Sequence, residues 1–173
     1  MGVRLRDAGR LPVRVLLWGG APLGSPPTKK AVRETLRTIR REARDDLRCE
    51  VDNTARLSHC HHQKAIVIDG QLAFVGGMDV TTFAGDRWDA EGHSLRAGVN
   101  WHDVEVLVEG EAVADVEGNF RQRWSEVTGD ARLPHIAPHI DPAWTTPVQV
   151  LRTIPRKTYK FAPGGEYGIH HAC

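Results

Sequence analysis

The chain lacks the features that mark disulfide-built, membrane-spanning or nucleic-acid-binding proteins. Its three cysteines, an odd number at irregular spacing, argue against a disulfide framework and suit a reducing compartment. The longest apolar runs are far too short to span a bilayer, and charged residues rather than an apolar signal core follow Met1. The formal net charge is +1, so no excess of basic residues points to nucleic acid. We therefore expect a cytoplasmic chain, with any membrane contact peripheral.

Length and hydrophobic pattern predict one α/β domain. A chain of 173 residues with 40% hydrophobic composition can bury one sizeable core. Apolar spacing predicts an arginine-rich helix capped by Thr28 and a second helix over 110–127. The second helix is expected to bury one apolar stripe: Val113, Val116, Phe120 and Trp124. The expected strands cover 12–18, 47–51, 65–68, 72–75, 101–108 and 148–154. With a loop over 81–100 and a linker over 134–147, this order is typical of an α/β sandwich with a mixed sheet flanked by helices.

The most informative segment is 62–70, where a histidine and a lysine stand two residues apart on a predicted strand. Side chains two apart on a strand point to the same face, so His62 and Lys64 are expected to project together. A neutral imidazole can attack phosphorus and form a phosphohistidine, while a fixed cation stabilises charge on the non-bridging oxygens. The pair therefore suits phosphodiester chemistry, with His62 as nucleophile or acid and Lys64 as the phosphate clamp.

The end of the same strand predicts a hairpin. The four residues after Lys64 are all apolar, which favours a strand covered on both faces. Asp69-Gly70 is a hairpin signal. Because Asp69 then lies at the far end of the strand from His62, we expect its side chain to tie down the turn or a nearby basic group. Direct contact with substrate is the alternative.

Four ordered blocks of the sequence resemble the phospholipase D superfamily. The segment "HHQKAIVIDGQLAFVGGMD" contains the HxKxxxxD signature of that superfamily, and "GDRWD", "WHDVEVLVEG" and "FRQRW" follow at similar spacing. The resemblance covers residues 11 to 173 and is to the first of two catalytic halves of a phosphatidylcholine-type phospholipase D. It implies a phospholipase D-like α/β sandwich that uses no cofactor.

The resemblance also implies a reaction. His62, Lys64 and Asp69 match the motif residues of enzymes in which one histidine attacks the phosphodiester and a histidine from the second half protonates the leaving alcohol. Water or another alcohol then releases the phosphatidyl group, by hydrolysis or transphosphatidylation.

Residues that follow the motif are expected to shape the phosphate site. Gly76 and Gly77 lack side chains and would let the backbone approach the phosphate closely. Asp79 stands where many relatives have asparagine, and a carboxylate there would repel the anion unless it is turned away or paired. Arg87 could contact phosphate or pair with Asp89; the resemblance favours a structural or substrate-rim role.

Asp103 is the candidate for orienting His62. A nucleophilic histidine needs one ring nitrogen fixed as a donor, and a buried carboxylate is the usual partner. The segment 101–108 alternates polar and apolar residues at its start, and the resemblance points to the same residue. The alternative is a surface salt bridge to one of the arginines.

The run His59, Cys60, His61 and His62 invites comparison with a zinc site. Contiguous ligands on an extended chain point alternately and rarely close a tetrahedron, and no second ligand pair follows at finger-like spacing. We therefore expect no metal, and we place His59 and His61 in a loop or at a strand edge near the cleft.

The chain contains one HxKxxxxD motif, whereas the resemblance implies two. One half cannot supply both nucleophile and acid, so the isolated chain is expected to be inactive. The favoured source of the other histidine is a second half in the same protein. Residues 1–133 would then be the first catalytic half and 134–173 the bridge to the missing second half, with the chain truncated at both ends. A homodimer is the alternative.

The leading functional prediction is a phospholipase D-type phosphodiesterase that acts on a glycerophospholipid at a peripheral membrane surface. One alternative is a phosphatidyltransferase of the cardiolipin-synthase kind, which usually carries asparagine after the glycines and has membrane segments. Another is a homodimeric nuclease or a non-catalytic relative, although the near-neutral charge argues against nucleic acid as a partner. The sequence leaves the head-group preference open.

Overall fold

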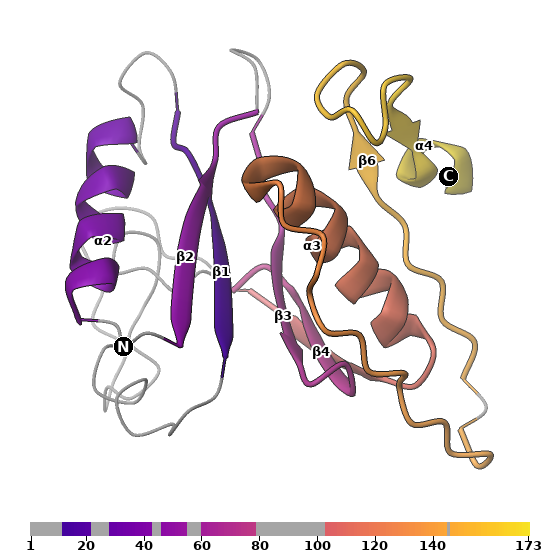
Figure 1. Ribbon diagram of the computed structural model, residues 1–173. Coiled ribbons are helices and arrows are strands. Elements are labelled where there is room, and N and C mark those ends of the chain that lie inside the picture. The colour runs from indigo at the N-terminus through magenta and orange to yellow at the C-terminus, as the bar shows by residue number, and fades with distance from the viewer. Residues whose placement is uncertain (1–11, 22–27, 43–45, 55–59, 79–102, 145) are drawn as a thin grey trace, which may run out of the picture. The chain divides into compact units, whose positions relative to one another are not determined.

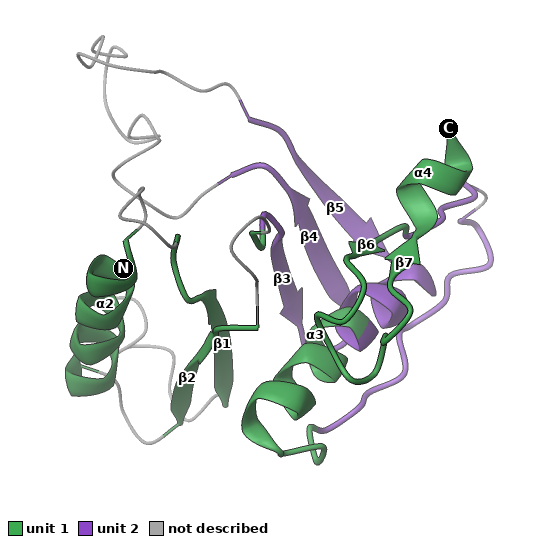
Figure 2. Ribbon diagram, turned by 90° about the horizontal axis from the view of Figure 1, so that it is seen from above, with its two compact units in different colours: residues 1–61, 119–133, 151–173 green, residues 62–118, 134–150 purple. Residues whose placement is uncertain are grey.

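The computed structural model describes residues 12–21, 28–42, 46–54, 60–78, 103–144 and 146–173 (Figure 1). The chain divides into two compact units whose segments alternate along the sequence (Figure 2). The first unit comprises Met1–His61, Asn119–Leu133 and Leu151–Cys173, and the second comprises His62–Gly118 and Pro134–Val150. Both units combine strands with helical segments, so the predicted α/β class is confirmed.

The first unit begins with a strand, a helix and a second strand. Strand β1 (Val13–Trp18) pairs in parallel with β2 (Leu47–Asp52), and the connecting helix α2 (Lys29–Glu42) packs on β2. The Thr28 hydroxyl accepts a hydrogen bond from the Ala31 amide at 3.1 Å, which satisfies one of the unpaired donors of the first helical turn. The predicted cap is therefore confirmed.

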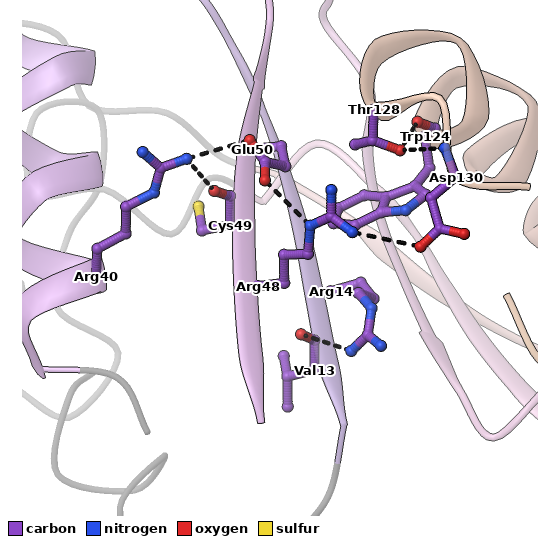
Figure 3. A network of polar contacts seen from close by, with 9 residues as sticks. All are labelled: Val13, Arg14, Arg40, Arg48, Cys49, Glu50, Trp124, Thr128 and Asp130. Carbon is purple, nitrogen blue, oxygen red and sulfur yellow. Dashed lines mark hydrogen bonds and ion pairs between the residues drawn. The ribbon is translucent and has the colours of Figure 1, made fainter. Parts of the chain in front are cut away.

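Arginine side chains tie β2 to its neighbours within the first unit (Figure 3). Arg40 of α2 donates to the Cys49 carbonyl and to Glu50, both at 3.1 Å. Arg48 donates to Glu50 at 3.1 Å and lies 5.2 Å from the centre of the buried Trp124 ring. These contacts give the arginines of the amphipathic α2–β2 region a packing role, although exposed ion pairs add little free energy individually.

The C-terminal part of the first unit contains two very short strands. Strand β6 (Thr153–Ile154) pairs antiparallel with β7 (Glu166–Tyr167), and α4 (Gly168–Ala172) follows. A small core of Ile154, Tyr159 and Ala162 lies beneath them. The predicted strand over 148–154 is wrong for its first five residues. A strand needs a neighbouring strand to pair with its backbone amide and carbonyl groups. Among the described segments, β7 pairs with only two of these residues, Thr153 and Ile154.

The second unit is built on a three-stranded antiparallel sheet. Its order is β3 (Lys64–Ile68), β4 (Leu72–Gly76) and β5 (Glu105–Glu109). The turn between β3 and β4 has positive φ at both Asp69 (52°) and Gly70 (67°), and the Gln71 amide donates to the Ile68 carbonyl at 2.9 Å. Two positive φ values define the hairpin turn that Asp-Gly favours, so the predicted hairpin is confirmed.

One face of this sheet is packed and the other is open. Ala73 forms a buried cluster with Val113 and Val116 from the first turns of α3 (Ala112–Thr128). On the opposite face, Ile66 and Leu107 are 53% and 51% exposed. The expectation that β3 is covered on both faces is therefore wrong for the described residues. An apolar run does not distinguish a strand covered twice from an antiparallel strand with one open face.

Helix α3 follows its predicted stripe. Val113, Val116 and Trp124 are buried, and Phe120 is half-buried and stacks on Trp124 with ring centres 5.7 Å apart. No helix in the described part of the chain combines the length and apolarity that crossing a bilayer requires.

Candidate active site

The motif histidine and lysine are in contact. His62 lies just before β3 and Lys64 begins it, and the Lys64 ammonium is 3.1 Å from Nε2 of His62. An ammonium group can only donate, so Nε2 is the acceptor if the two groups form a hydrogen bond. The contact places Nε2 of His62 beside a cation that can bind a phosphate oxygen.

Two glycines, Gly76 and Gly77, leave space for side chains on the sheet next to His62 and Lys64. Lys64 pairs with Gly76 across β3 and β4, and Gly76 pairs with Glu105 across β4 and β5. A Cβ atom on Gly76 would lie 2.4 Å from a Glu105 carboxylate oxygen, and one on Gly77 would lie 2.3 Å from an Asp103 carboxylate oxygen. Each glycine thus makes room for a carboxylate from the neighbouring segment.

Asp103 is exposed and lies just before β5, beside Gly77. The described contacts include no hydrogen bond between Asp103 and His62, and β4 lies between the strands that carry them. Two strand spacings amount to about 10 Å. The role of Asp103 as the residue that orients His62 stays a prediction.

Asp69 lies where the hairpin predicts, exposed and at the opposite end of β3 from His62. Whether its role is structural stays a prediction. Asp79, Arg87 and His59 lie outside the described residues.

A buried polar cluster in the first unit was not predicted. Asp52, at the end of β2, is 0% exposed. Its carboxylate accepts hydrogen bonds from the Thr54 amide at 2.9 Å, from Arg123 at 3.1 Å and from the Tyr159 hydroxyl at 2.5 Å. His61 Nε2 lies 3.3 Å from the same carboxylate and contacts the Tyr159 hydroxyl. The residue directly before His62 is therefore anchored in a buried network.

The network shifts two pKa values. Burial alone would raise the pKa of Asp52, but hydrogen bonds from His61, Thr54 and Tyr159 outweigh it and hold that pKa well below its usual range. Burial and the hydrogen bond to Asp52 raise the pKa of Tyr159 to about 12. The network therefore contains an ionised carboxylate and a neutral phenol at neutral pH.

The network could not be predicted from the sequence because two of its members, Arg123 and Tyr159, are far from Asp52 along the chain. Arg123 and Tyr159 stand 71 and 107 positions from Asp52. The available signal was an aspartate at the end of a strand that alternates apolar and charged residues, which by itself does not identify partners. For metals, no group of three or more His, Cys, Asp or Glu side chains in the described segments is arranged to hold an ion.

Comparisons with known proteins identify related enzymes. No family model matches the chain. "Phospholipase D C" of Dictyostelium discoideum is 25% identical over 124 residues, covering 52% of this chain and 7% of that protein. "Phospholipase D B" of the same organism is 30% identical over 118 residues, covering 50% and 10%. The cardiolipin synthase of Geobacillus kaustophilus (strain HTA426) is 38% identical over 73 residues, covering 42% and 13%.

These matches confirm the resemblance to the phospholipase D superfamily. The chain is similar both to phospholipases D and to cardiolipin synthases, over about half of its length. The matched part spans about a tenth of the length of these relatives.

Proposed function

We propose that the chain is one catalytic half of an enzyme that cleaves or transfers the phosphodiester of glycerophospholipids. The observation that carries this proposal is the 3.1 Å contact between the Lys64 ammonium and His62 Nε2 within the HxKxxxxD pattern of this sequence. The chain is also similar to enzymes named phospholipase D and cardiolipin synthase. The relatives' names support chemistry at a phospholipid phosphodiester in general. Phosphatidylcholine-like lipids as substrate, with hydrolysis to phosphatidate, are the finer part of the proposal.

The proposed reaction has two displacements. His62 Nε2 attacks phosphorus, the bond from phosphorus to the head-group oxygen breaks, and the leaving alcohol takes a proton from a second histidine. That histidine then removes a proton from water or an acceptor alcohol, whose oxygen attacks phosphorus and breaks the bond to His62. Lys64 stabilises the charge on the non-bridging oxygens in both steps.

The second histidine must come from outside this motif. We propose a second motif-bearing half in the same protein, with 1–133 as the first half, 134–173 as the bridge, and the two halves built as α/β sandwiches with a mixed sheet. A homodimer is the alternative arrangement. In either case the reaction takes place at a lipid surface, which the enzyme would meet peripherally.

Neighbouring residues have proposed supporting roles. Asp103 would orient an imidazole of the site through a carboxylate hydrogen bond. Gly76 and Gly77 would let the backbone approach the phosphate closely, Asp79 would belong to the phosphate site, and Arg87 would have a structural or substrate-rim role. Asp69 would hold the hairpin that ends β3.

The cardiolipin synthases among the relatives favour a second candidate function, transfer of a phosphatidyl group to a lipid alcohol. The two functions differ in the acceptor of the second displacement. Incubation of the full-length protein with phosphatidylglycerol distinguishes them: cardiolipin is the product of the transferase, and phosphatidate is the product of the hydrolase.

A variant assay tests the proposed function. The full-length protein should release choline from phosphatidylcholine vesicles, and His62→Ala should lower the rate at least about 1000-fold because the nucleophile is lost. His170→Ala, at an exposed histidine in α4, is the matched control and should keep the wild-type rate. Absence of head-group release and of transfer in the wild type, or equal rates in wild type and His62→Ala, would overturn the proposal.

A further inference from the structure

The Glu105 carboxylate and the motif lysine, Lys64, lie in one row of cross-strand partners on the exposed face of the β3–β4–β5 sheet. Lys64, Gly76 and Glu105 are direct cross-strand partners, so their Cα–Cβ directions point to one face. The position between the two charged residues is a glycine, and two strand spacings put the Lys64 and Glu105 Cα atoms about 10 Å apart. The row therefore has a cation at one side, an anion at the other and no side chain on the residue between them.

The Glu105 carboxylate reaches into this row. One of its oxygens lies 2.4 Å from where a Cβ of Gly76 would stand, and the same oxygen accepts a hydrogen bond from the Met78 amide at 3.4 Å. Lys64 points its ammonium toward His62, 3.1 Å from Nε2. Among the described ion pairs, none joins Glu105 to a basic side chain.

An anion at this place has an electrostatic consequence. A carboxylate beside a phosphate site repels an anionic substrate and costs binding energy unless a cation lies next to it. A substrate whose head group carries an ammonium supplies that cation. Such a head group bridges the two sides of the row, with its phosphate at Lys64 and its amine at Glu105.

We propose that Glu105 is a specificity-determining residue that binds the cationic amine of a zwitterionic phospholipid head group. This inference rests on the proposed function of His62 and Lys64. An acceptor-only carboxylate attracts a quaternary or primary ammonium and disfavours head groups that are neutral or anionic. Glu105 takes no part in bond making or breaking; it sets which leaving alcohol is accepted.

A structural role for Glu105 makes a different prediction. If its carboxylate served mainly to hold the Met78 amide after β4, its loss would weaken turnover of every lipid in equal proportion. A preference between head groups therefore separates the two roles.

The experiment compares Glu105→Gln with Glu109→Gln in the full-length protein. Glutamine keeps the shape of the side chain and can still accept a hydrogen bond from Met78, but it removes the charge. Glu109 lies on the same strand and, by alternation, on the same face, exposed and four residues further along. It is thus a matched control for the loss of one negative charge from β5.

The measured quantity is kcat/KM on vesicles of phosphatidylcholine, phosphatidylethanolamine and phosphatidylglycerol. Glu105→Gln should lower kcat/KM about tenfold for the two amine-bearing lipids and leave it equal or raised for phosphatidylglycerol, because one charge-assisted contact is lost. Glu109→Gln should keep the wild-type ratios. Equal effects of Glu105→Gln on all three lipids, or no effect, would overturn this inference while leaving the proposed function intact. Failure of His62→Ala to lower activity would overturn the proposed function and this inference with it.

Discussion

At the scale of single residues, the described part of the chain contains an exposed histidine–lysine contact and a buried carboxylate network. His62 and Lys64 contact each other at an exposed histidine, where a substrate can reach them. Asp52 is fully buried and satisfied by hydrogen bonds from several partners. The first arrangement suits chemistry and the second suits stability, since a buried ion is tolerated only when it is paired and hydrogen-bonded.

The buried carboxylate predicts a pH-dependent stability. Asp52→Asn should lower the free energy of unfolding by about 3–5 kcal/mol at neutral pH, because the buried ion pair between Asp52 and Arg123 is broken by removal of one charge. The pKa of Asp52 is depressed in the folded state, so its contribution is present above the unfolded value of about 4 and is lost as pH falls below it. Urea unfolding of both proteins between pH 7 and pH 3 measures this.

The difference between wild type and Asp52→Asn should therefore shrink as the pH falls. Asp130→Asn is the control, because it removes a carboxylate that contacts arginines outside the buried network. Its effect should be much smaller than that of Asp52→Asn at neutral pH. A constant difference between wild type and Asp52→Asn over the whole range would contradict the depressed pKa.

At the scale of elements, local sequence signals determine where helices and turns begin. Thr28 caps α2 through its hydroxyl. Thr28→Ala should lower the free energy of unfolding by about 1 kcal/mol, since the Ala31 amide loses its acceptor. Thr38→Ala, at an exposed position inside the same helix, should leave stability unchanged or slightly increase it. A loss at position 38 as large as that at position 28 would argue against the cap.

The hairpin turn allows the two interpretations of Asp69 to be separated. Its φ of 52° is tolerated by asparagine but costs alanine about 1 kcal/mol, so Asp69→Asn should keep stability and Asp69→Ala should lose it. If Asp69 acts through the turn, Asp69→Asn in the full-length protein also keeps most of the activity. Native stability of Asp69→Asn together with loss of activity would contradict the structural interpretation.

These elements show which features could be predicted from the sequence. The cap at Thr28, the Asp69-Gly70 turn and the apolar stripe of α3 depend on residues within a few positions of one another. The Asp52 network includes Arg123 and Tyr159, which stand more than 70 positions away, so no local pattern identifies it. The role of Glu105 depends on the register of β3, β4 and β5, which brings it into one row with Lys64. The open face of β3 depends on which elements pack there, which an apolar run does not specify.

At the scale of the whole molecule, a single histidine–lysine motif is combined with similarity to phospholipid-modifying enzymes. The described segments supply one histidine and lysine pair, and the similarity extends over about a tenth of the relatives' length. The proposed mechanism requires a second histidine as acid and base, so the chain produced alone as a monomer should release no head group. Sedimentation together with the choline-release assay checks this: an active monomer of this chain would contradict the requirement for a second half.

Detection of the covalent phosphohistidine intermediate tests the role of His62 as the nucleophile. The full-length protein is mixed with phosphatidylcholine, quenched within one turnover and digested, and the peptides are analysed by mass spectrometry under conditions that preserve phosphoramidate bonds. A phosphatidyl group is expected on the peptide that contains His62, and no such adduct is expected in His62→Ala. An adduct on a different residue, with the His62 peptide unmodified, would contradict the role of His62 as the nucleophile.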